Sequence, residues 1–293
     1  MQSWDLERKI RIAQTRILEW IMHYDGQVYV SFSGGKDSTV LLDLARRVDN
    51  SIKAVFCNTG LEYPEIVEFV KTIDNVVWLK PKMSFVKVVE KYGYPAVSKE
   101  QSAFIQEYRD TKSEKLKNIR WNGNKHGLGK ISEKWKFLVD APFKVSDKCC
   151  DIMKKEPAKR FEKETGLYPI IGTTADESVQ RLSNWLMYGC NAFDKKRPTS
   201  QPLSFWTEQD ILRYIKEFNI PYAKVYGDIV EEDGILKCTG EPRTGCFTCM
   251  YGVHLEKEPN KFQRMKVSHP KLYNYCINGL GLGEVLDFIG VKY

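Results

Sequence analysis

No stretch of apolar residues in the 293-residue sequence approaches the length needed to cross a bilayer. The first residues, Met1 to Glu7, also lack the basic-then-apolar order of a signal peptide. Only four histidines are present, and they form no recognisable metal-binding cluster. The lack of a long apolar run argues against a membrane protein, and the lack of a signal-peptide pattern argues against a secreted one. We therefore expect a cytoplasmic protein with no membrane partner.

The sequence contains neither an internal repeat nor a low-complexity tract, and its apolar share of 42% is ordinary for a globular protein. It has eight cysteines, several of them bunched as Cys149-Cys150 and Cys246-x-x-Cys249. Such bunching suits metal or redox chemistry better than a disulfide framework. We expect a folded chain in reducing surroundings.

Apolar spacing predicts alternating helices and strands in the first part of the chain. Leu6, Ile10, Ala13, Ile17 and Ile21 recur at steps of three or four. In order, we expect a helix at 4–24, a strand at 27–32, a helix at 38–48, strands at 52–57 and 76–79 with a helix at 64–72 between them, and a later strand at 168–172. This alternation predicts an α/β fold with a doubly wound, mostly parallel sheet.

Two segments stand apart from this pattern. Residues 98–146 are polar and basic, with twelve Lys or Arg against seven Asp or Glu between Lys99 and Lys148, and we expect a helical insertion with a mobile loop. After a capped helix that begins at Thr207, the chain beyond Val230 is expected to be irregular and cysteine-rich. The predicted domains are therefore 1–230 and 231–293.

The most informative motif is Ser33-Gly34-Gly35-Lys36-Asp37-Ser38, at the junction of a strand and a helix. Two glycines let the backbone approach an anion, and the first turn of the helix offers free N–H groups and the positive end of its dipole. Gly-Gly turns are also common structural features. The motif lacks the long glycine-to-glycine spacing of the G-x-x-x-x-G-K-[ST] loop, so different chemistry is expected.

The stretch Ser31 to Ser38 resembles the PP-loop of the phosphoadenosine phosphosulfate (PAPS) reductase family, near its iron–sulfur members and its DNA-phosphorothioation ATPases. Three later stretches support the resemblance: Asn58-Thr59-Gly60-Leu61-Glu62-Tyr63-Pro64-Glu65, Pro202 to Asp210, and Asn219-Ile220-Pro221-Tyr222. The resemblance implies an adenine nucleotide alpha hydrolase-like fold and a nucleotide site. The residues that it assigns to ATP or PAPS are Ser33, Gly34, Gly35, Lys36, Asp37, Ser38, Asn58, Thr59, Gly60 and Gly172.

The same resemblance implies catalytic roles for Lys36, Asp37 and Arg181, with Asp37 helping to hold Mg²⁺. Glu177-Ser178 and Arg181 are similar to the family's R-x-x-E-S-x-x-R stretch, but Thr174 stands where the first arginine belongs. Glu177 and Arg181 also fit a simple i,i+4 ion pair on a helix. Sulfonucleotide reductases resemble one another in a Glu-Cys-Gly tail, and this chain ends Gly290-Val291-Lys292-Tyr293 instead.

The cysteines imply a metal centre. Cys149-Cys150 resembles the cysteine pair of the family members that carry a [4Fe-4S] cluster, with Cys246 and Cys249 as the distant C-x-x-C partner and Cys238 as a fifth candidate. Thiolates are the natural ligands of iron–sulfur clusters. A structural zinc site and cysteines without any metal are the alternatives.

Three functions remain open at this point. The first is an ATP pyrophosphatase or adenylylating enzyme linked to sulfur transfer, the second is a PAPS or adenosine phosphosulfate reductase, and the third is a nucleotide- and nucleic-acid-binding module with a structural metal. The basic segment with interleaved tryptophans suits either a nucleic-acid partner or a lid over a nucleotide. A sulfur-carrier partner and a homo-oligomer also remain open.

Overall fold

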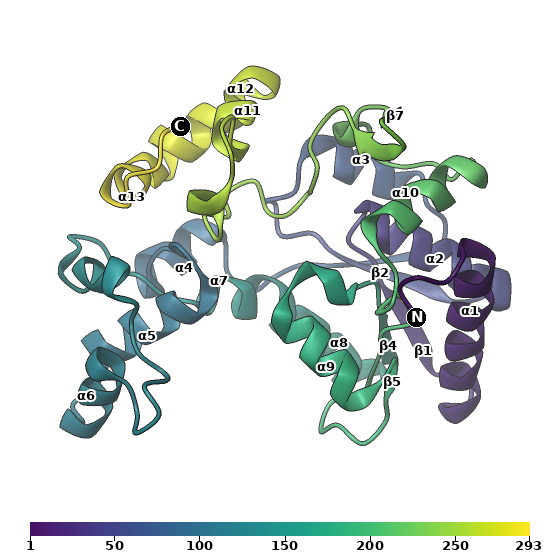
Figure 1. The fold of residues 1–293 in the computed structure, drawn as a ribbon, viewed down its shortest axis with the longest axis horizontal. Helices are drawn as coiled ribbons and strands as arrows, with labels where there is room; N and C mark the ends of the chain where they lie inside the picture. Colours follow the sequence, from purple (N-terminus) through teal and green to yellow (C-terminus); the bar gives the residue numbers. More distant parts are fainter. The chain divides into compact units, whose positions relative to one another are not determined.

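The computed structural model describes residues 1–293, and its contacts divide the chain into two compact units (Figure 1). The sheet unit comprises Met1–Lys80 and Pro157–Thr244, and the helical unit comprises Pro81–Glu156 and Gly245–Tyr293. The chain thus passes between the units after Lys80, Glu156 and Thr244. The domain boundary drawn at residue 230 stays a prediction.

The sheet unit holds a six-stranded sheet in the order β3-β2-β1-β4-β6-β5, in which β5 alone is antiparallel to its neighbour. Its strands are β1 (Val28–Ser31), β2 (Lys53–Cys57), β3 (Val76–Leu79), β4 (Tyr168–Ile171), β5 (Asn191–Ala192) and β6 (Thr199–Ser200). Its helices are α1 (Leu6–His23), α2 (Lys36–Val48), α3 (Pro64–Lys71), α8 (Glu156–Thr165), α9 (Val179–Tyr188) and α10 (Glu208–Glu217), with short turns η3 (Ala175–Glu177) and η4 (Lys224–Tyr226). The predicted doubly wound, mostly parallel α/β fold is confirmed.

Helices cover the sheet on both faces, as its apolar strands require. In Figure 1 the strands lie between α8 and α9 on one side and α1 and α2 on the other. Tyr29 of β1 and Val55 of β2 pack with Phe161 of α8 in one buried cluster. The sequence therefore forms a layered core because its strands carry apolar residues toward both faces.

Strand order places the glycine turn at the centre of the sheet. β1 pairs with β2 on one side, where Val30 lies opposite Ala54, and with β4 on the other side, where Val30 lies opposite Ile170. The order of the strands therefore reverses at β1: β2 and β3 follow on one side, and β4 and the later strands follow on the other. A doubly wound sheet binds its ligands at the carboxyl ends of the strands where this reversal occurs. Ser33 to Ser38 follow β1 at this point, Asn58 follows β2 and Gly172 follows β4.

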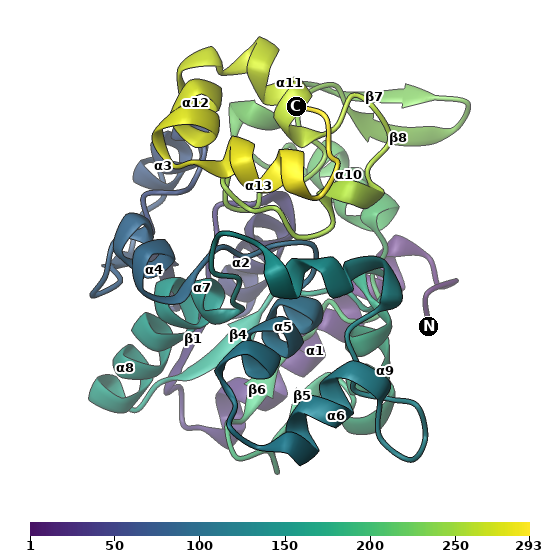
Figure 2. The same cartoon turned by 90° about the vertical axis from the view of Figure 1, so that its left-hand side faces the viewer.

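The helical unit contains no strand, and its helices come from two distant stretches of the chain (Figure 2). The first stretch forms α4 (Phe85–Tyr92), α5 (Lys99–Asp110), α6 (Glu114–Asn122), η1 (Glu133–Asp140), α7 (Lys148–Cys150) and η2 (Asp151–Lys155). The second forms η5 (Val253–Leu255), α11 (Lys261–Ser268), α12 (Pro270–Asn274), η6 (Tyr275–Gly279) and α13 (Leu282–Phe288). No helix of the protein is both long and apolar enough to span a membrane.

The expectation of an irregular chain beyond Val230 was wrong. A hairpin of β7 (Ile229–Glu232) and β8 (Ile235–Cys238) turns at Asp233-Gly234, where both residues have positive φ. This is the residue pair that a two-residue hairpin favours. Helix α11 begins with a reciprocal capping box between Asn260 and Gln263. Both signals, the Asp-Gly pair and the Asn-x-x-Gln spacing, are local features of the sequence.

Candidate functional site: a phosphate turn and a cysteine group

The glycine turn is fixed by its surroundings. Gly34 has φ +71, and a Cβ atom there would lie 2.8 Å from Cγ2 of both Ile66 and Val70 in α3. Only glycine adopts this backbone without strain and leaves room for the α3 side chains. The turn between β1 and α2 therefore packs directly against α3.

The first residues of α2 present polar groups at the end of β1. The Oγ atoms of Ser33 and Ser38 lie 3.0 Å apart, and Ser33 N–H donates to Ser38 Oγ at 3.2 Å. The N–H of Lys36 donates to the hydroxyl of Tyr226 at 3.1 Å. Serine hydroxyls and backbone N–H groups at a helix N-terminus are suitable partners for phosphate oxygens.

Lys36 is a buried cation, with its side chain 6% exposed. Its ammonium lies 2.5 Å from Oε1 of Glu208 and donates to the carbonyl of Pro242 at 2.7 Å. Glu208 is the first residue of α10, and 56% of its side chain is exposed. A buried ammonium needs such partners, because an unpaired buried charge is strongly unfavourable.

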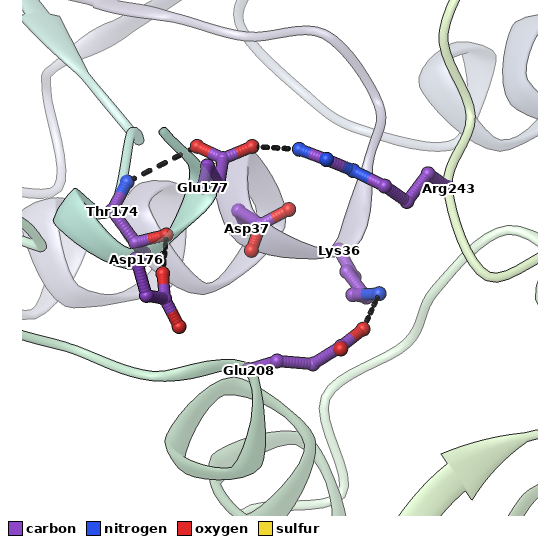
Figure 3. Close-up of a pocket in the computed structure, with 7 residues that line it drawn as sticks. All are labelled: Lys36, Asp37, Thr174, Asp176, Glu177, Glu208 and Arg243. Atoms are coloured by element: carbon purple, nitrogen blue, oxygen red, sulfur yellow. Dashed lines mark hydrogen bonds and ion pairs between the residues drawn. The ribbon is translucent and has the colours of Figure 1, made fainter. Parts of the chain in front are cut away.

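A cavity of about 210 Å³ opens beside this ion pair (Figure 3). It is lined by Lys36, Asp37, Thr174, Asp176, Glu177, Glu208 and Arg243, all from the sheet unit. Glu177 forms ion pairs with both Arg243 and Arg181, and it accepts a hydrogen bond from the N–H of Thr174 at 3.3 Å. Four carboxylates and two cations thus face one space.

Asp37 lies in the first turn of α2 and lines this cavity. Burial raises the pKa of its carboxyl, and the positive charge of Lys36 acts in the opposite direction. The neighbouring carboxylate of Glu208 also favours the protonated acid. A cation entering the cavity would therefore stabilise the ionised form of Asp37.

Four of the five candidate metal-binding cysteines lie in the helical unit. Cys149 and Cys150 belong to α7, and Cys246 and Cys249 flank a tight turn in which the Cys249 N–H donates to the Cys246 carbonyl at 3.0 Å. Burial raises the pKa of Cys149, and the nearby Cys150, Cys246 and Cys249 raise it further. The other three thiols are thus near enough to Cys149 to disfavour its ionised form.

Cys238 is separate from this group. It ends β8 in the sheet unit, and its pKa is raised by burial and lowered by the charge of Lys36. Among all residues of the chain, no three Cys, His, Asp or Glu side chains converge in the manner of ligands to a single metal ion.

A buried lysine supports the C-x-x-C turn. The ammonium of Lys261, in the first turn of α11, donates to the backbone carbonyls of Cys246 at 2.5 Å and Cys249 at 3.2 Å. Burial lowers the pKa of Lys261, while the nearby thiols of Cys249, Cys246 and Cys276 oppose this shift. Lys261 was not among the predicted site residues.

Comparison with known protein families identifies the family of this chain. The sequence matches the phosphoadenosine phosphosulfate reductase domain over residues 27–126 and 98–250. The chain belongs to this family. The family prediction made from the PP-loop motif is confirmed.

Relatives within the PAPS reductase family are distant in sequence. The chain is 25% identical over 288 residues to "Uncharacterized protein MJ0973" of Methanocaldococcus jannaschii, covering 94% of this chain and 53% of that protein, so it spans about half of that relative. It is 23% identical to adenosine 5'-phosphosulfate reductase 2 of Bacillus subtilis, over 78% of this chain and 79% of that protein. The corresponding reductase of Geobacillus kaustophilus is 25% identical, over 80% of this chain and 77% of that protein.

Two solved structures resemble the chain. The phosphate complex of the PAPS reductase of Candida auris has a TM-score of 0.42 and 19% identity, with 72% of this chain and 82% of that chain covered. The U34-tRNA thiolase NcsA of Methanococcus maripaludis, with its [4Fe-4S] cluster, has a TM-score of 0.39 and 14% identity, with 95% of this chain and 80% of that chain covered.

Within the family motif, the structure places the predicted nucleotide residues at three neighbouring strand ends. A Cβ atom on Gly172, after β4, would lie 3.2 Å from the carbonyl oxygen of Asp37, so β4 approaches α2 closely. After β2, the hydroxyl of Thr59 donates to Glu62 at 2.6 Å, and the N–H of Gly60 donates to the side chain of Asn58 at 3.0 Å. Of these residues, Lys36 and Asp37 line the cavity itself.

The three predicted catalytic residues are only partly brought together. Lys36 and Asp37 line the cavity, whereas Arg181 is held beside it through Glu177. Sequence reasoning missed Glu208, Asp176 and Arg243 as lining residues. Glu208 lies within the family-like Trp206-Thr207-Glu208 helix start, which was a usable signal, whereas Arg243 lies in an irregular loop that offers none.

Proposed function

We propose that this protein is a PP-loop enzyme that binds Mg²⁺-ATP, cleaves it between the α- and β-phosphates, and transfers adenylate to an acceptor as a step toward sulfur transfer. The observation that carries the proposal is the charge of the cavity beside the phosphate turn. Four carboxylates, Asp37, Asp176, Glu177 and Glu208, face it, and its lining cations are Lys36 and Arg243. Arg181 lies beside the cavity, ion-paired with Glu177, so that the carboxylates still outnumber the cations.

This charge balance favours a nucleotide that arrives with a divalent cation. A nucleotide phosphate chain is itself an anion, and like charges at short range in a partly buried site repel strongly. Mg²⁺ is held by carboxylates together with substrate phosphates, so the surplus acids of this cavity suit Mg²⁺-ATP. A sulfonucleotide without a metal ion would meet this surplus of carboxylates and bring no cation of its own.

The chain's own groups fit the expected chemistry. An acceptor oxygen attacks the α-phosphorus, the bond to the bridging oxygen breaks, and pyrophosphate leaves with the electron pair of that bond. The ammonium of Lys36 and the dipole of α2 stabilise the charge on the leaving group. Asp37 contributes to holding the metal ion of the substrate.

The cysteine group fits a thiolate-bound centre. Cys149, Cys150, Cys246 and Cys249 would hold it. Burial and the neighbouring thiols raise the pKa of Cys149 and Cys150, and a bound cation would favour their ionised form. The donor set suits an iron–sulfur cluster, which spreads its thiolates over several iron atoms, and such a cluster supplies electrons or a binding place for sulfur. Zinc is the alternative occupant of the same thiols.

A second candidate function is reduction of a sulfonucleotide, supported by the names of the Bacillus and Geobacillus relatives. Against it stand the four carboxylates of the cavity, which disfavour a sulfonucleotide that arrives without a metal ion. A third candidate is a module that binds nucleotide and nucleic acid without turnover. It would differ from both enzymes in forming no product from either nucleotide.

The experiment follows the products formed from each nucleotide. Purified holoprotein is incubated with ATP labelled at the α- or γ-phosphate, with Mg²⁺ or with a chelator, and separately with PAPS and adenosine phosphosulfate plus thioredoxin. AMP and pyrophosphate formed only with Mg²⁺, and lost in Lys36→Met but retained in the exposed control Lys53→Met, support the proposal. Sulfite release from a sulfonucleotide without Mg²⁺ would overturn it in favour of the reductase. Tight binding of both nucleotides without any product would favour the binding module.

A further inference from the structure

The two units differ in charge. The helical unit contains 23 Lys and Arg residues against 14 Asp and Glu, a net charge of +9, whereas the sheet unit contains 22 against 24, a net charge of −2. The basic surplus of the whole chain therefore lies in the unit that does not contain the phosphate turn. A surplus of this kind attracts polyanions, and the sheet unit's nucleotide site does not account for it.

One cavity of the helical unit gathers several of these cations. Its volume is about 320 Å³, and it is lined by Lys91, Tyr92, Gln106, Arg109, Asp110, Lys144 and Val145. Lys91 lies in the last turn of α4, Arg109 in the last turn of α5, and Lys144 in the segment after η1. Cations from three separate segments thus face one space.

The backbone around this cavity is held in place by specific contacts. The N–H of Tyr94 donates to the carbonyl of Lys144 at 2.8 Å. A Cβ atom on Gly93 would lie 2.4 Å from the carbonyl carbon of Lys144, so glycine is required for this approach. Because the two segments meet here, the ammonium of Lys144 reaches the carbonyl of Lys91 at 3.4 Å.

Arg109 is oriented by the same segment. Its guanidinium donates to the carbonyls of Ala141 at 2.9 Å and Phe143 at 2.7 Å. These neutral acceptors fix the direction of the side chain but leave its charge uncompensated. None of the three cations forms an ion pair within the described chain, and Asp110 is the single carboxylate in the lining.

We propose that this cavity is a second phosphate-binding site, and that its ligand is a phosphodiester of a single-stranded nucleic acid. Three oriented cations without anionic partners match a phosphate group. The ring of Tyr92, with the ammonium of Lys91 5.1 Å from its centroid, lies in the same lining and offers a base a stacking surface.

The neighbouring surface extends this site along a chain of phosphates. Helix α6 follows α5 and has no buried residue, and the exposed Lys112 and Lys115 come three and six residues after Arg109. Neither lysine forms an ion pair in the structure, and the same holds for the exposed Lys125 in the loop after α6. A mononucleotide would use the cavity alone, whereas a polynucleotide reaches these lysines as well.

The site is tested by binding measurements in the absence of ATP. Fluorescence anisotropy is followed for oligoadenylate RNA and for the matching DNA, each of about 12 nucleotides, between about 50 and 200 mM salt. The double variant Arg109→Gln, Lys144→Gln is compared with the control Lys257→Gln, Lys271→Gln, which removes two exposed charges elsewhere in the helical unit. We expect the first variant to bind at least about tenfold more weakly and to lower the salt slope by about 1.4, with the control close to the parent. RNA and DNA arms then show which sugar is preferred.

Three outcomes would overturn the proposal. An equal loss of oligonucleotide affinity in both double variants would mean that only the net charge of the unit matters. Binding of polyglutamate as tight as that of the oligonucleotides would mean that any polyanion suffices. Binding of inorganic phosphate or AMP without any binding of the oligonucleotides would reduce the site to a mononucleotide pocket. Circular dichroism melting checks that each variant folds. ATP cleavage in the same variants is expected to be unchanged, so failure of this inference is distinguishable from failure of the proposed function.

Discussion

The ammonium of Lys36 lies 2.5 Å from the carboxylate of Glu208, and this contact joins the first turn of α2 to the first turn of α10. The lysine is almost fully buried, but more than half of the glutamate side chain is exposed. Phosphate oxygens that bind to Lys36 must therefore displace Glu208 or share the ammonium with it. The exposed partner is the one that is free to move.

Removing this carboxylate charge should strengthen nucleotide binding. In Glu208→Gln, the ammonium of Lys36 loses its competing anion, and the effect of a half-exposed ion pair is about 1 kcal/mol or less, equivalent to about fivefold in affinity. Calorimetric titration with the non-cleavable α,β-methylene analogue of ATP, with Mg²⁺ at saturation, measures the change. Glu217→Gln, at the exposed far end of the same helix, is the matched control. Weaker binding by Glu208→Gln would instead mean that Glu208 acts mainly as a metal ligand.

Gly34→Ala should destabilise the fold more than an alanine at another glycine with the same backbone. Gly34 and Gly166 have φ +71 and +73, but a Cβ atom meets two methyl groups at 2.8 Å at Gly34 and open space at Gly166. We expect the free energy of unfolding to fall by about 1 to 2 kcal/mol in Gly166→Ala from backbone strain alone. In Gly34→Ala, overpacking adds about 1 to 3 kcal/mol.

Urea unfolding of both glycine variants measures this difference. A similar loss of stability in the two variants would show that the α3 side chains move aside at little cost, which would contradict the packing argument.

The contrast between Gly34 and Arg243 shows which parts of the site the sequence predicts. The glycine turn is local, because its strand, its two glycines and its helix are consecutive, and periodicity and turn chemistry therefore predict it. Arg243 reaches the cavity from a loop more than 60 residues beyond its partner Glu177. No local pattern encodes that pairing, because it depends on how the hairpin of β7 and β8 returns the chain to the sheet.

The cysteines also show that local spacing predicts only part of a site, because the rest depends on contacts between distant stretches of the chain. The spacing of Cys246 and Cys249 predicts a metal-binding turn, and the structure brings them near Cys149 and Cys150, which lie about a hundred residues earlier. Cys238, only eight residues before Cys246, belongs instead to the sheet unit. Proximity in sequence was thus a poor guide, since the chain leaves one unit for the other after Thr244.

Stability should fall at alkaline pH because of Cys190. Burial raises the pKa of this thiol from 9.0 to about 11. Above pH 9 the unfolded chain loses this proton while the folded chain keeps it, so the free energy of unfolding falls as pH rises toward 11. The full effect of this one group is at most about 2 to 3 kcal/mol.

The variant Cys190→Ala isolates that contribution. Its free energy of unfolding, measured by urea titration from about pH 8 to pH 11, should fall less steeply than that of the parent. Parallel curves would rule out a linked proton at Cys190. In the parent, iodoacetamide should also label Cys190 slowly near pH 8, because a protonated thiol is a poor nucleophile.

Lys261→Met should loosen the C-x-x-C turn and lower the metal content of the protein. The ammonium of Lys261 donates to the carbonyls of Cys246 and Cys249, and its charge lies near the thiols of both residues. Methionine keeps much of the apolar stem but leaves two carbonyls without their charged donor, which costs about 1.5 to 3 kcal/mol. It also removes a cation that would offset the charge of thiolates bound to a metal.

Thermal melting and the iron, zinc and sulfide content per chain are compared with Lys266→Met, which changes an exposed lysine on the same helix. A lower melting temperature with reduced metal content only in Lys261→Met supports a role in holding the turn, whereas unchanged values in both variants would show that the cysteine group forms without it.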